Sequence, residues 1–222
     1  MERSPQIDWT EEGVPVSRAH DDPYFSRRGG LAEAQHVFLG GTGLPARFRP
    51  GFRIAELGVG TGLNLLAAWA AWRAAGVAGR LRYTGFEAAP MAAGDMARAL
   101  GAFPELEGLA VPLLAAWRAG ARRIIAPGLE AEIVVGDARA TVPRWPGAAE
   151  AWFLDGFAPA RNPEMWEPAL LAAVARRMAP GGRLATYSAA GSMRRALAEA
   201  GVVVERRPGF AGKRHMSVGW RA

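Results

Sequence analysis

The fold of this chain is decided by one stretch of its sequence, Phe52-Arg53-Ile54-Ala55-Glu56-Leu57-Gly58-Val59-Gly60-Thr61-Gly62-Leu63-Asn64. A short apolar run with an acid near its end comes first, three glycines follow at alternate positions, and an Ala/Leu/Trp-rich pattern comes next. Apolar runs that end at glycines are typical of buried strands, and the periodicity that follows is typical of a helix. The stretch therefore predicts a strand, a tight loop and a helix, with a nucleotide-like ligand at the loop.

The three glycines make this loop suitable for holding a ligand closely. Gly58, Gly60 and Gly62 lack a Cβ atom, so the backbone can pass close to a ligand and adopt conformations closed to other residues. The helix that begins near Leu63 directs unpaired N–H groups and a partial positive charge at whatever lies in front of it. A dinucleotide-binding G-x-G-x-x-G loop would have glycine at position 63, and Glu56 suits a ligand with an ammonium group better than a pyrophosphate. A purely structural strand-to-helix turn is the alternative interpretation.

This loop resembles the E-x-G-x-G loop of class I S-adenosylmethionine methyltransferases. The resemblance implies that the ligand is S-adenosylmethionine, which carries both a nucleoside and an ammonium group. The residues predicted to bind this cofactor are Glu56, Gly58, Gly60, Thr61, Gly62 and Asn64.

Two further acids follow strand patterns in the same half of the chain. Glu87 ends the strand expected over 81–87, where one carboxylate of a nucleoside-binding α/β fold accepts hydrogen bonds from both ribose hydroxyls. Asp137 follows the strand expected over 129–135, where an acid in S-adenosylmethionine-binding folds often accepts the adenine amino group. Both are predicted to bind the cofactor. A helix N-cap before Ala138 is the alternative for Asp137.

Asp155 is the best candidate for chemistry. It ends the apolar run Ala151-Trp152-Phe153-Leu154, which has the pattern of a buried parallel strand. Ligands of open α/β sheets collect at the carboxyl edge, where such an acid would lie. An Asx-turn acid before Gly156 is the alternative.

Strand and helix patterns alternate along the chain after residue 50. They predict an α/β fold with a mostly parallel sheet covered on both faces and a terminal antiparallel strand. The resemblance to class I methyltransferases implies the Rossmann-like form of this fold, with seven strands in the sheet. Residues 1–50 are polar and turn-rich, and we expect them to form an N-terminal cap. The cap and the methyltransferase domain expected over 51–222 are predicted to be parts of one domain.

Composition limits the classes of protein and site that are possible. The chain has 222 residues, 50% of them hydrophobic, which is enough for a substantial core. It has no cysteine, which excludes disulfides and thiolate-ligated metals, and its three histidines show no metal-ligand spacing. No window offers the roughly 18 uninterrupted apolar residues of a membrane span. We expect no metal, no membrane association and a cytoplasmic location.

Basic side chains are concentrated in the C-terminal part of the chain. Residues 161–222 carry 11 basic and 4 acidic side chains, whereas residues 1–160 carry 16 basic and 17 acidic ones. This asymmetry is typical of a polyanion-binding face, although solvated arginine-rich helix faces would give it too. The residues predicted to bind phosphates are Arg194, Arg195, Arg206, Arg207, Lys213 and Arg214.

Aromatic residues near the N-terminus are candidates for substrate binding. Tyr24 and Phe25 lie next to Arg27 and Arg28 in the sequence, so they could stack a base while the arginines hold a phosphate. Aromatic residues next to a proline such as Pro23 also serve as loop anchors, and this alternative stays open.

Separated motifs along nearly the whole chain resemble the methyltransferase domain of the MnmC family. They include Asp21-Asp22-Pro23-Tyr24-Phe25-Ser26, Gly60-Thr61-Gly62-Leu63-Asn64, Trp152-Phe153-Leu154-Asp155-Gly156-Phe157-Ala158-Pro159, Asn162-Pro163-Glu164-Met165-Trp166 and Gly209-Phe210-Ala211-Gly212-Lys213-Arg214. That family makes the final methyl transfer in forming 5-methylaminomethyl-2-thiouridine at the tRNA wobble position. The resemblance implies N-methylation of the 5-aminomethyl group of wobble (2-thio)uridine, with tRNA as partner. It also adds Phe157, Pro159, Asn162 and Trp166 to the expected substrate site.

Many members of that family carry a second, FAD-dependent oxidase domain. The only glycine loop here is already used, so we expect no FAD, and a tRNA that already bears the aminomethyl group or receives it from a separate enzyme. Two other functions remain open: a small-molecule amine N-methyltransferase or aminopropyltransferase, and a non-catalytic RNA-binding protein on the same fold. A basic C-terminal third argues against a polyamine pocket, which needs acidic walls.

Overall fold

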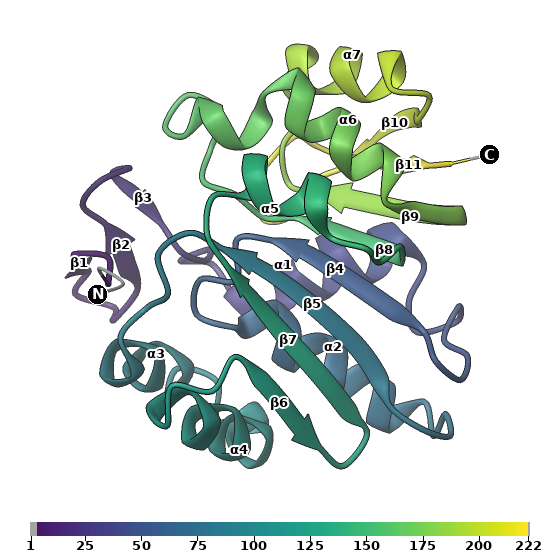
Figure 1. Ribbon diagram of the computed structural model, residues 1–222. Helices are drawn as coiled ribbons and strands as arrows, with labels where there is room; N and C mark the ends of the chain where they lie inside the picture. Colours follow the sequence, from purple (N-terminus) through teal and green to yellow (C-terminus); the bar gives the residue numbers. More distant parts are fainter. Residues whose placement is uncertain (1–3, 222) are drawn as a thin grey trace.

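A central sheet of eight strands organises the structure, in the order β10-β11-β9-β8-β4-β5-β7-β6 (Figure 1). The computed structural model describes residues 4–221. The strands of this sheet are β4 (Arg53–Leu57), β5 (Leu81–Glu87), β6 (Arg123–Ala126), β7 (Leu129–Val135), β8 (Ala149–Leu154), β9 (Met178–Thr186), β10 (Val203–Pro208) and β11 (His215–Trp220). Strands β9, β8, β4, β5 and β7 pair in parallel, whereas β6, β11 and β10 pair antiparallel at the two edges.

The predicted α/β class and its antiparallel terminal strand are confirmed, but the expected number of seven strands is one too few. The strand β6 at one edge forms a hairpin with β7 and pairs Ile124 with Ala131, as the strand, turn and strand patterns of residues 122–135 predict. Pro127 and Gly128 turn the chain between them, and Gly128 has a φ of 80°, which glycine adopts without strain. A hairpin needs only the free edge of its neighbour, so it extends the sheet without changing the parallel part.

Helices cover both faces of the sheet (Figure 1). They are α1 (Gly30–Ala34), the π-helix η1 (Gln35–Gly40), α2 (Leu63–Ala74), α3 (Ala93–Leu100), the 3-10 helix η2 (Pro104–Leu106), α4 (Glu107–Arg118), α5 (Ala138–Arg144), the 3-10 helix η3 (Pro163–Trp166), α6 (Pro168–Arg176) and α7 (Gly191–Glu199). Helices α1 to α4 share one apolar core with the sheet, and α5 to α7 share the other.

Alternation along the central strands explains the two cores. Phe153 belongs to the core on the α2 side, whereas its neighbours Trp152 and Leu154 belong to the core on the α6 side. Successive side chains of a strand point to opposite faces, so a strand with helices on both sides must be apolar throughout. Trp69 and Trp72 of α2 are almost fully buried in the first core.

Residues 4–50 pack against the sheet. A small antiparallel sheet of β1 (Ile7–Trp9), β2 (Pro15–Ser17) and β3 (Asp22–Pro23) precedes α1 and η1. Further along, the Arg47 guanidinium donates hydrogen bonds to the backbone oxygens of Glu150 and Gly181, over 3.3 Å and 3.0 Å. These contacts support the proposal that residues 1–50 and the rest form one cooperative unit.

Within residues 4–221, no helix taken singly has the length and apolar character needed to cross a membrane. Only the bent pair of residues 93–100 and 104–118, with 115° between its halves, meets the same criterion.

We predict that Arg47→Met lowers the free energy of unfolding by about 1 to 3 kcal/mol, because it leaves backbone carbonyl groups without their donor. Urea unfolding followed by circular dichroism measures this change. Arg49→Met is the matched control: Arg49 is largely exposed in its ion pair with Glu150, so its loss should cost under about 1 kcal/mol. Two separate transitions, with only one of them affected by Arg47→Met, would contradict the single unit.

Candidate active site

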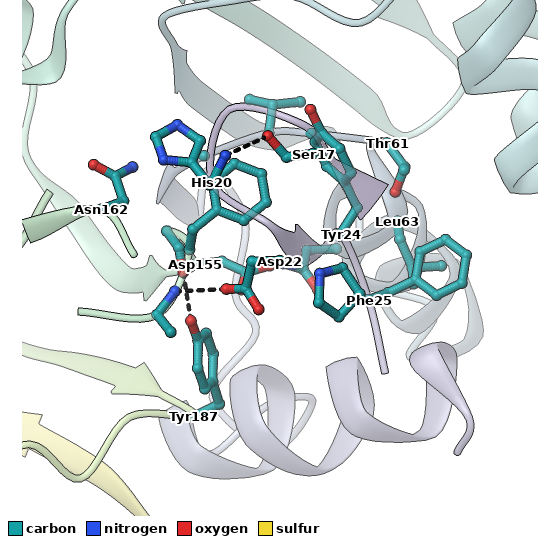
Figure 2. Close-up of a pocket in the computed structure, with 18 of the residues that line it drawn as sticks. Ser17, His20, Asp22, Tyr24, Phe25, Thr61, Leu63, Asp155, Asn162 and Tyr187 are labelled. Atoms are coloured by element: carbon teal, nitrogen blue, oxygen red, sulfur yellow. Dashed lines mark hydrogen bonds between the residues drawn. The ribbon is translucent and has the colours of Figure 1, made fainter. Parts of the chain in front are cut away.

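A cavity of about 730 Å³ lies at the carboxyl edge of the sheet, where β4, β5 and β8 end (Figure 2). Loops that follow these strands line one side of it, and residues of the N-terminal segment line the other. A volume of this size suits a ligand of nucleoside dimensions. The predicted site residues that line it are Tyr24, Phe25, Gly58, Gly60, Thr61, Asn64, Glu87, Asp155, Phe157, Asn162 and Lys213.

The glycine loop has the geometry expected of a close ligand contact. Gly58 has a φ of 80° and Gly60 a φ of 51°, in the left-handed region that favours glycine. A Cβ atom on Gly58 would clash with the backbone oxygen of Asp155, and one on Gly60 would lie 3.0 Å from the ring of Tyr24. Gly62 does not line the cavity and is the N-cap of α2. Close packing against other parts of the protein thus requires glycine at positions 58 and 60, and the approach of this backbone to an adenosyl group stays a prediction.

Glu87 presents a carboxylate to the cavity from the end of β5. Its two oxygens accept hydrogen bonds from the backbone N–H groups of Gly60 and Ala89, each over 2.9 Å. Burial raises the pKa of Glu87, and these N–H donors partly offset the increase. Each oxygen keeps a second lone pair, so the carboxylate can still accept from two vicinal hydroxyl groups.

Asp155 follows β8 and faces the same cavity. Its Oδ2 accepts a hydrogen bond from the Asn64 side-chain amide over 2.6 Å. The pKa of Asp155 is raised to about 7, mainly by burial; the Asn64 hydrogen bond and the Lys213 charge oppose this increase, and the carboxylates of Glu33 and Asp22 add to it. A carboxyl group with a pKa near neutrality can exchange a proton at physiological pH.

Glu56 lies beneath the cavity and does not line it. Its side chain is fully buried, with Oε1 accepting from Asn64 over 2.7 Å and Oε2 from the Tyr83 hydroxyl over 2.6 Å. Burial raises the pKa of Glu56 well above its ordinary value, and the charge of Asp155 adds to this. A direct contact between Glu56 and a cofactor stays a prediction.

Asp137 adopts the N-cap role that was left open for it. Its Oδ1 accepts from the backbone N–H of Arg139 over 2.8 Å, and its Oδ2 pairs with the Arg139 guanidinium over 2.7 Å. The hydrogen bond from Arg139 lowers the pKa of Asp137. The next residue, Ala138, lines the cavity, so the backbone of this turn borders the site while the Asp137 carboxylate is exposed and ion-paired.

The loop after β8 is held in place by residues from three other segments. Asp22 Oδ2 accepts from the backbone N–H of Ala158 over 2.8 Å, and the Tyr187 hydroxyl donates to the backbone oxygen of Gly156 over 2.7 Å (Figure 2). Trp166, predicted to bind substrate, instead donates its indole N–H to the backbone oxygen of Phe157 over 2.8 Å. Neither Trp166 nor Pro159 lines the cavity; Trp166 supports its wall through this hydrogen bond, and contact of either residue with substrate stays a prediction.

Aromatic rings gather where the N-terminal segment meets this loop. The Phe157 ring is stacked with His20 at 4.7 Å and meets Tyr24 edge-on at 5.1 Å. Phe25 lines the cavity and packs edge-on against Phe103 at 5.1 Å. Tyr24 and Phe25 are therefore both loop anchors and cavity walls, which combines the two interpretations of their sequence.

Some of the residues that line the cavity and interact with the predicted ones were not predicted from the sequence. Among them are His20, Asp22, Glu33 and Tyr187. Glu33 is bound by Lys213 over 2.7 Å, and the Lys213 ammonium lies 4.4 Å from the centre of the Tyr187 ring. Asp22 belongs to a quoted motif, which was the one available clue to its role.

The remaining predicted phosphate-binding residues lie outside the cavity. Arg194 and Arg195 are on α7, and Arg206, Arg207 and Arg214 line a separate shallow groove at the β10–β11 hairpin. Among the residues described, no group of three or more His, Asp or Glu side chains could hold a metal ion.

A family model described as S-adenosyl-L-methionine-dependent methyltransferase matches residues 104–222. The tRNA 5-methylaminomethyl-2-thiouridine biosynthesis bifunctional protein MnmC of Stutzerimonas stutzeri (strain A1501) is 44% identical over 95% of this chain. The protein of the same name from Caulobacter vibrioides is 45% identical over 96% of it. The chain spans 34% and 37% of the lengths of these relatives. The resemblance to the MnmC family is thereby confirmed.

Solved structures agree on the fold. The crystal structure of MNMC2 from Aquifex aeolicus matches with a TM-score of 0.76 at 24% identity, over 98% of this chain and 70% of that chain. DesVI from Streptomyces venezuelae matches with a TM-score of 0.52 at 15% identity, over 88% and 93% of the respective chains.

We predict that Asp155 makes the protein less stable as the pH rises from about 4 to about 7. The folded pKa is about 7 against an ordinary value of 3.8, so within this window the unfolded chain has lost a proton that the folded chain keeps. The free energy of unfolding therefore falls with rising pH, and the effect ends once both states are ionised. Urea unfolding of the natural protein and of Asp155→Asn measures it across this range. A difference between the two proteins that does not change with pH would contradict the raised pKa.

Proposed function

This chain belongs to the family of S-adenosyl-L-methionine-dependent methyltransferases, and we propose that it methylates the 5-aminomethyl group of the wobble (2-thio)uridine in tRNA. The observation that carries the proposal is Asp155, a carboxyl group with a pKa near 7 at the edge of a cavity built on the glycine loop. Relatives named for tRNA 5-methylaminomethyl-2-thiouridine biosynthesis, 44–45% identical over nearly the whole chain, supply the class of substrate.

The cofactor would bind along the glycine loop. Gly58, Gly60 and Thr61 offer backbone next to the cavity, and Glu87 offers a carboxylate for ribose hydroxyls. The loop after β7 at Asp137 and Ala138 would border the adenine. When bound, S-adenosylmethionine supplies a methyl group already activated on a sulfonium sulfur. No other cofactor is needed for this chemistry, and the absence of FAD stays a prediction.

The nucleoside would enter between the N-terminal segment and the loop after β8. Tyr24, Phe25 and Phe157 offer ring surfaces for a base, and Asn162 offers an amide at the same wall. Base stacking on aromatic rings contributes about 1 to 3 kcal/mol per base. Lys213 lies at this wall as well, although Glu33 already binds its ammonium group.

Attack on the methyl group requires an uncharged amine, because a protonated alkylamine has no lone pair. We propose that the ionised Asp155 carboxylate accepts a hydrogen bond from the amine and aims its lone pair at the methyl carbon. The new N–C bond forms as the S–C bond breaks, and the nitrogen becomes a secondary ammonium. That ammonium passes a proton to Asp155, which releases it to water. Orientation is the larger contribution, since in-line geometry raises the rate of a transfer between bound groups strongly.

The raised pKa answers a difficulty of this mechanism. An ordinary aspartate is too weak a base to take a proton from an alkylammonium, and its charge favours the ammonium form. Burial at the end of β8 brings the pKa of Asp155 to about 7, closer to that of the amine, which makes proton uptake after the transfer easier.

Mass analysis of nucleosides tests the function directly. Hypomodified tRNA that carries 5-aminomethyl-2-thiouridine is incubated with S-adenosylmethionine and this protein, digested and compared with a reaction without cofactor. Conversion of the wobble nucleoside to its N-methyl form supports the proposal. Unchanged nucleosides, with methylation of a free alkylamine instead, would favour a small-molecule N-methyltransferase.

We also propose a cytoplasmic location and a separate enzyme as the source of the aminomethyl tRNA.

We predict that Asp155→Asn lowers kcat by about a hundredfold or more, because the amide cannot take up the proton. The dissociation constant for S-adenosylmethionine, measured by calorimetry, should stay within about threefold. Asp21→Asn is the matched control, since Asp21 is exposed and paired with Arg161. Turnover close to that of the control in a folded Asp155→Asn protein would remove Asp155 from the mechanism.

We predict that affinity for tRNA falls steeply with salt, because arginines that contact phosphates release counterions from the nucleic acid. Replacing Arg206 and Arg207 by glutamine should lower the slope of log affinity against log salt by about 2. Arg73→Gln is the control, because Arg73 lies in the last turn of α2, at the end of the helix away from the glycine loop. Filter binding over a salt series measures the slopes. Binding that is independent of salt would contradict a phosphate-contacting face.

A further inference from the structure

Four side chains from four separate elements meet beneath the cavity. Tyr83 of β5 donates to Glu56 of β4 over 2.6 Å, and Asn64 of α2 donates to both Glu56 and Asp155, over 2.7 Å and 2.6 Å. Glu56 and Tyr83 are almost completely buried, at 0% and 1% exposure, and Asn64 is 6% exposed. Glu56 and Tyr83 therefore lie inside the protein, whereas Asn64 and Asp155 form the end of the network that lines the cavity.

The chemistry of the amide fixes how the network is arranged. An asparagine side chain has two N–H donors on Nδ2, and here one of them serves each carboxylate. The opposite amide orientation would place the carbonyl oxygen against two carboxylates, which is repulsive. Donation to Asp155 is therefore coupled to donation to Glu56, which the Tyr83 hydroxyl holds in turn.

We infer that Asn64 is a positioning residue for Asp155: anchored by Glu56 and Tyr83, it holds Asp155 Oδ2 so that Oδ1 is turned to the reacting amine. Within the described residues only Oδ2 of Asp155 accepts a side-chain hydrogen bond, which leaves Oδ1 for a ligand. The catalytic part of this inference rests on the proposed function, whereas the hydrogen bond and its effect on Asp155 do not.

This role differs from the cofactor contact that the sequence suggests for Asn64. Because both N–H donors are engaged by carboxylates, only the amide oxygen remains to accept a hydrogen bond. An asparagine used in this way sets the orientation and the proton affinity of a neighbouring acid. The two roles make different predictions for cofactor affinity.

Several charged or titratable groups face Asp155 from the elements packed around it, and all of them are kept in the experiment. They are Asp22 of β3, Glu33 of α1, Glu56 of β4, Glu87 of β5, Tyr187 after β9 and Lys213 of the β10–β11 loop. Because only position 64 is changed, a change in the titration of Asp155 reports the loss of the Asn64 hydrogen bonds, both the one to Asp155 and the one to its neighbour Glu56.

The test is a titration of Asp155 by carbon-13 NMR of labelled aspartate carboxyl groups, with the Asp155 signal assigned from Asp155→Asn. In Asn64→Leu, the pKa of Asp155 should rise by about one to two pH units, the effect of losing one hydrogen bond to a charged group. Asn64→Ser keeps a single donor and should give a smaller increase. If Asn64→Leu does not fold, Asn64→Ser serves as the test on its own. Calorimetry should show S-adenosylmethionine affinity within about threefold of the natural protein.

Methylation assays separate this inference from the proposed function. In Asn64→Leu, kcat should fall while KM for S-adenosylmethionine stays unchanged, and the acid limb of the pH profile should move up with the pKa of Asp155. An Asp155 pKa equal to that of the natural protein in both variants overturns the inference, and so does a large loss of cofactor affinity with that pKa unchanged. If the natural protein methylates no tRNA while the pKa moves as stated, the proposed function fails and the positioning role of Asn64 stands.

Discussion

The site depends on three adjacent parallel strands that end at the same level. Leu57 of β4 pairs with Phe86 of β5 on one side and with Leu154 of β8 on the other. Backbone bonds continue this alignment beyond the strands, from Gly58 N–H to Phe86 O over 2.9 Å and from Asp155 N–H to Leu57 O over 3.0 Å. The next residue of each strand therefore emerges at one edge, which brings the glycine loop, Glu87 and Asp155 together although they are far apart in sequence.

That alignment explains how much of the site could be predicted from the sequence. The glycine spacing and the two acids at strand ends are local patterns, and the rule that parallel strands end at one edge converts them into a site. Asp22, Glu33 and Tyr187 gave no such pattern, because their roles come from contacts with other segments of the chain: Asp22 with Ala158, Glu33 with Lys213, and Tyr187 with Gly156. Alternating strand and helix patterns predict a mostly parallel sheet, but the order of its eight strands depends on pairing between segments distant in sequence, which no local pattern encodes.

Glu56 shows why the identity of a motif residue does not decide its exposure. Its position matches an E-x-G-x-G loop, yet its carboxylate lies under the cavity because Tyr83, on the neighbouring strand, supplies a buried hydroxyl partner. Hydrogen-bond partners such as Tyr83 decide whether a carboxyl group is buried or faces a ligand, and these partners lie in other parts of the chain. The charged residues of the cavity differ in position too. The acidic residues Glu87 and Asp155 lie at the ends of strands, whereas the basic residues Arg27 and Arg28 line the cavity from exposed positions.

The contact between Asp22 and Ala158 also bears on how the chain reaches its final shape. During synthesis the segment around Tyr24 leaves the ribosome long before Phe157 and Ala158, the residues it packs against. Contacts between residues so distant in sequence form late, because closing a long loop costs entropy before any contact rewards it. We therefore expect the contacts between the segment around Tyr24 and the loop after β8 to form only after most of the sheet has folded, so that the cavity is completed late in folding.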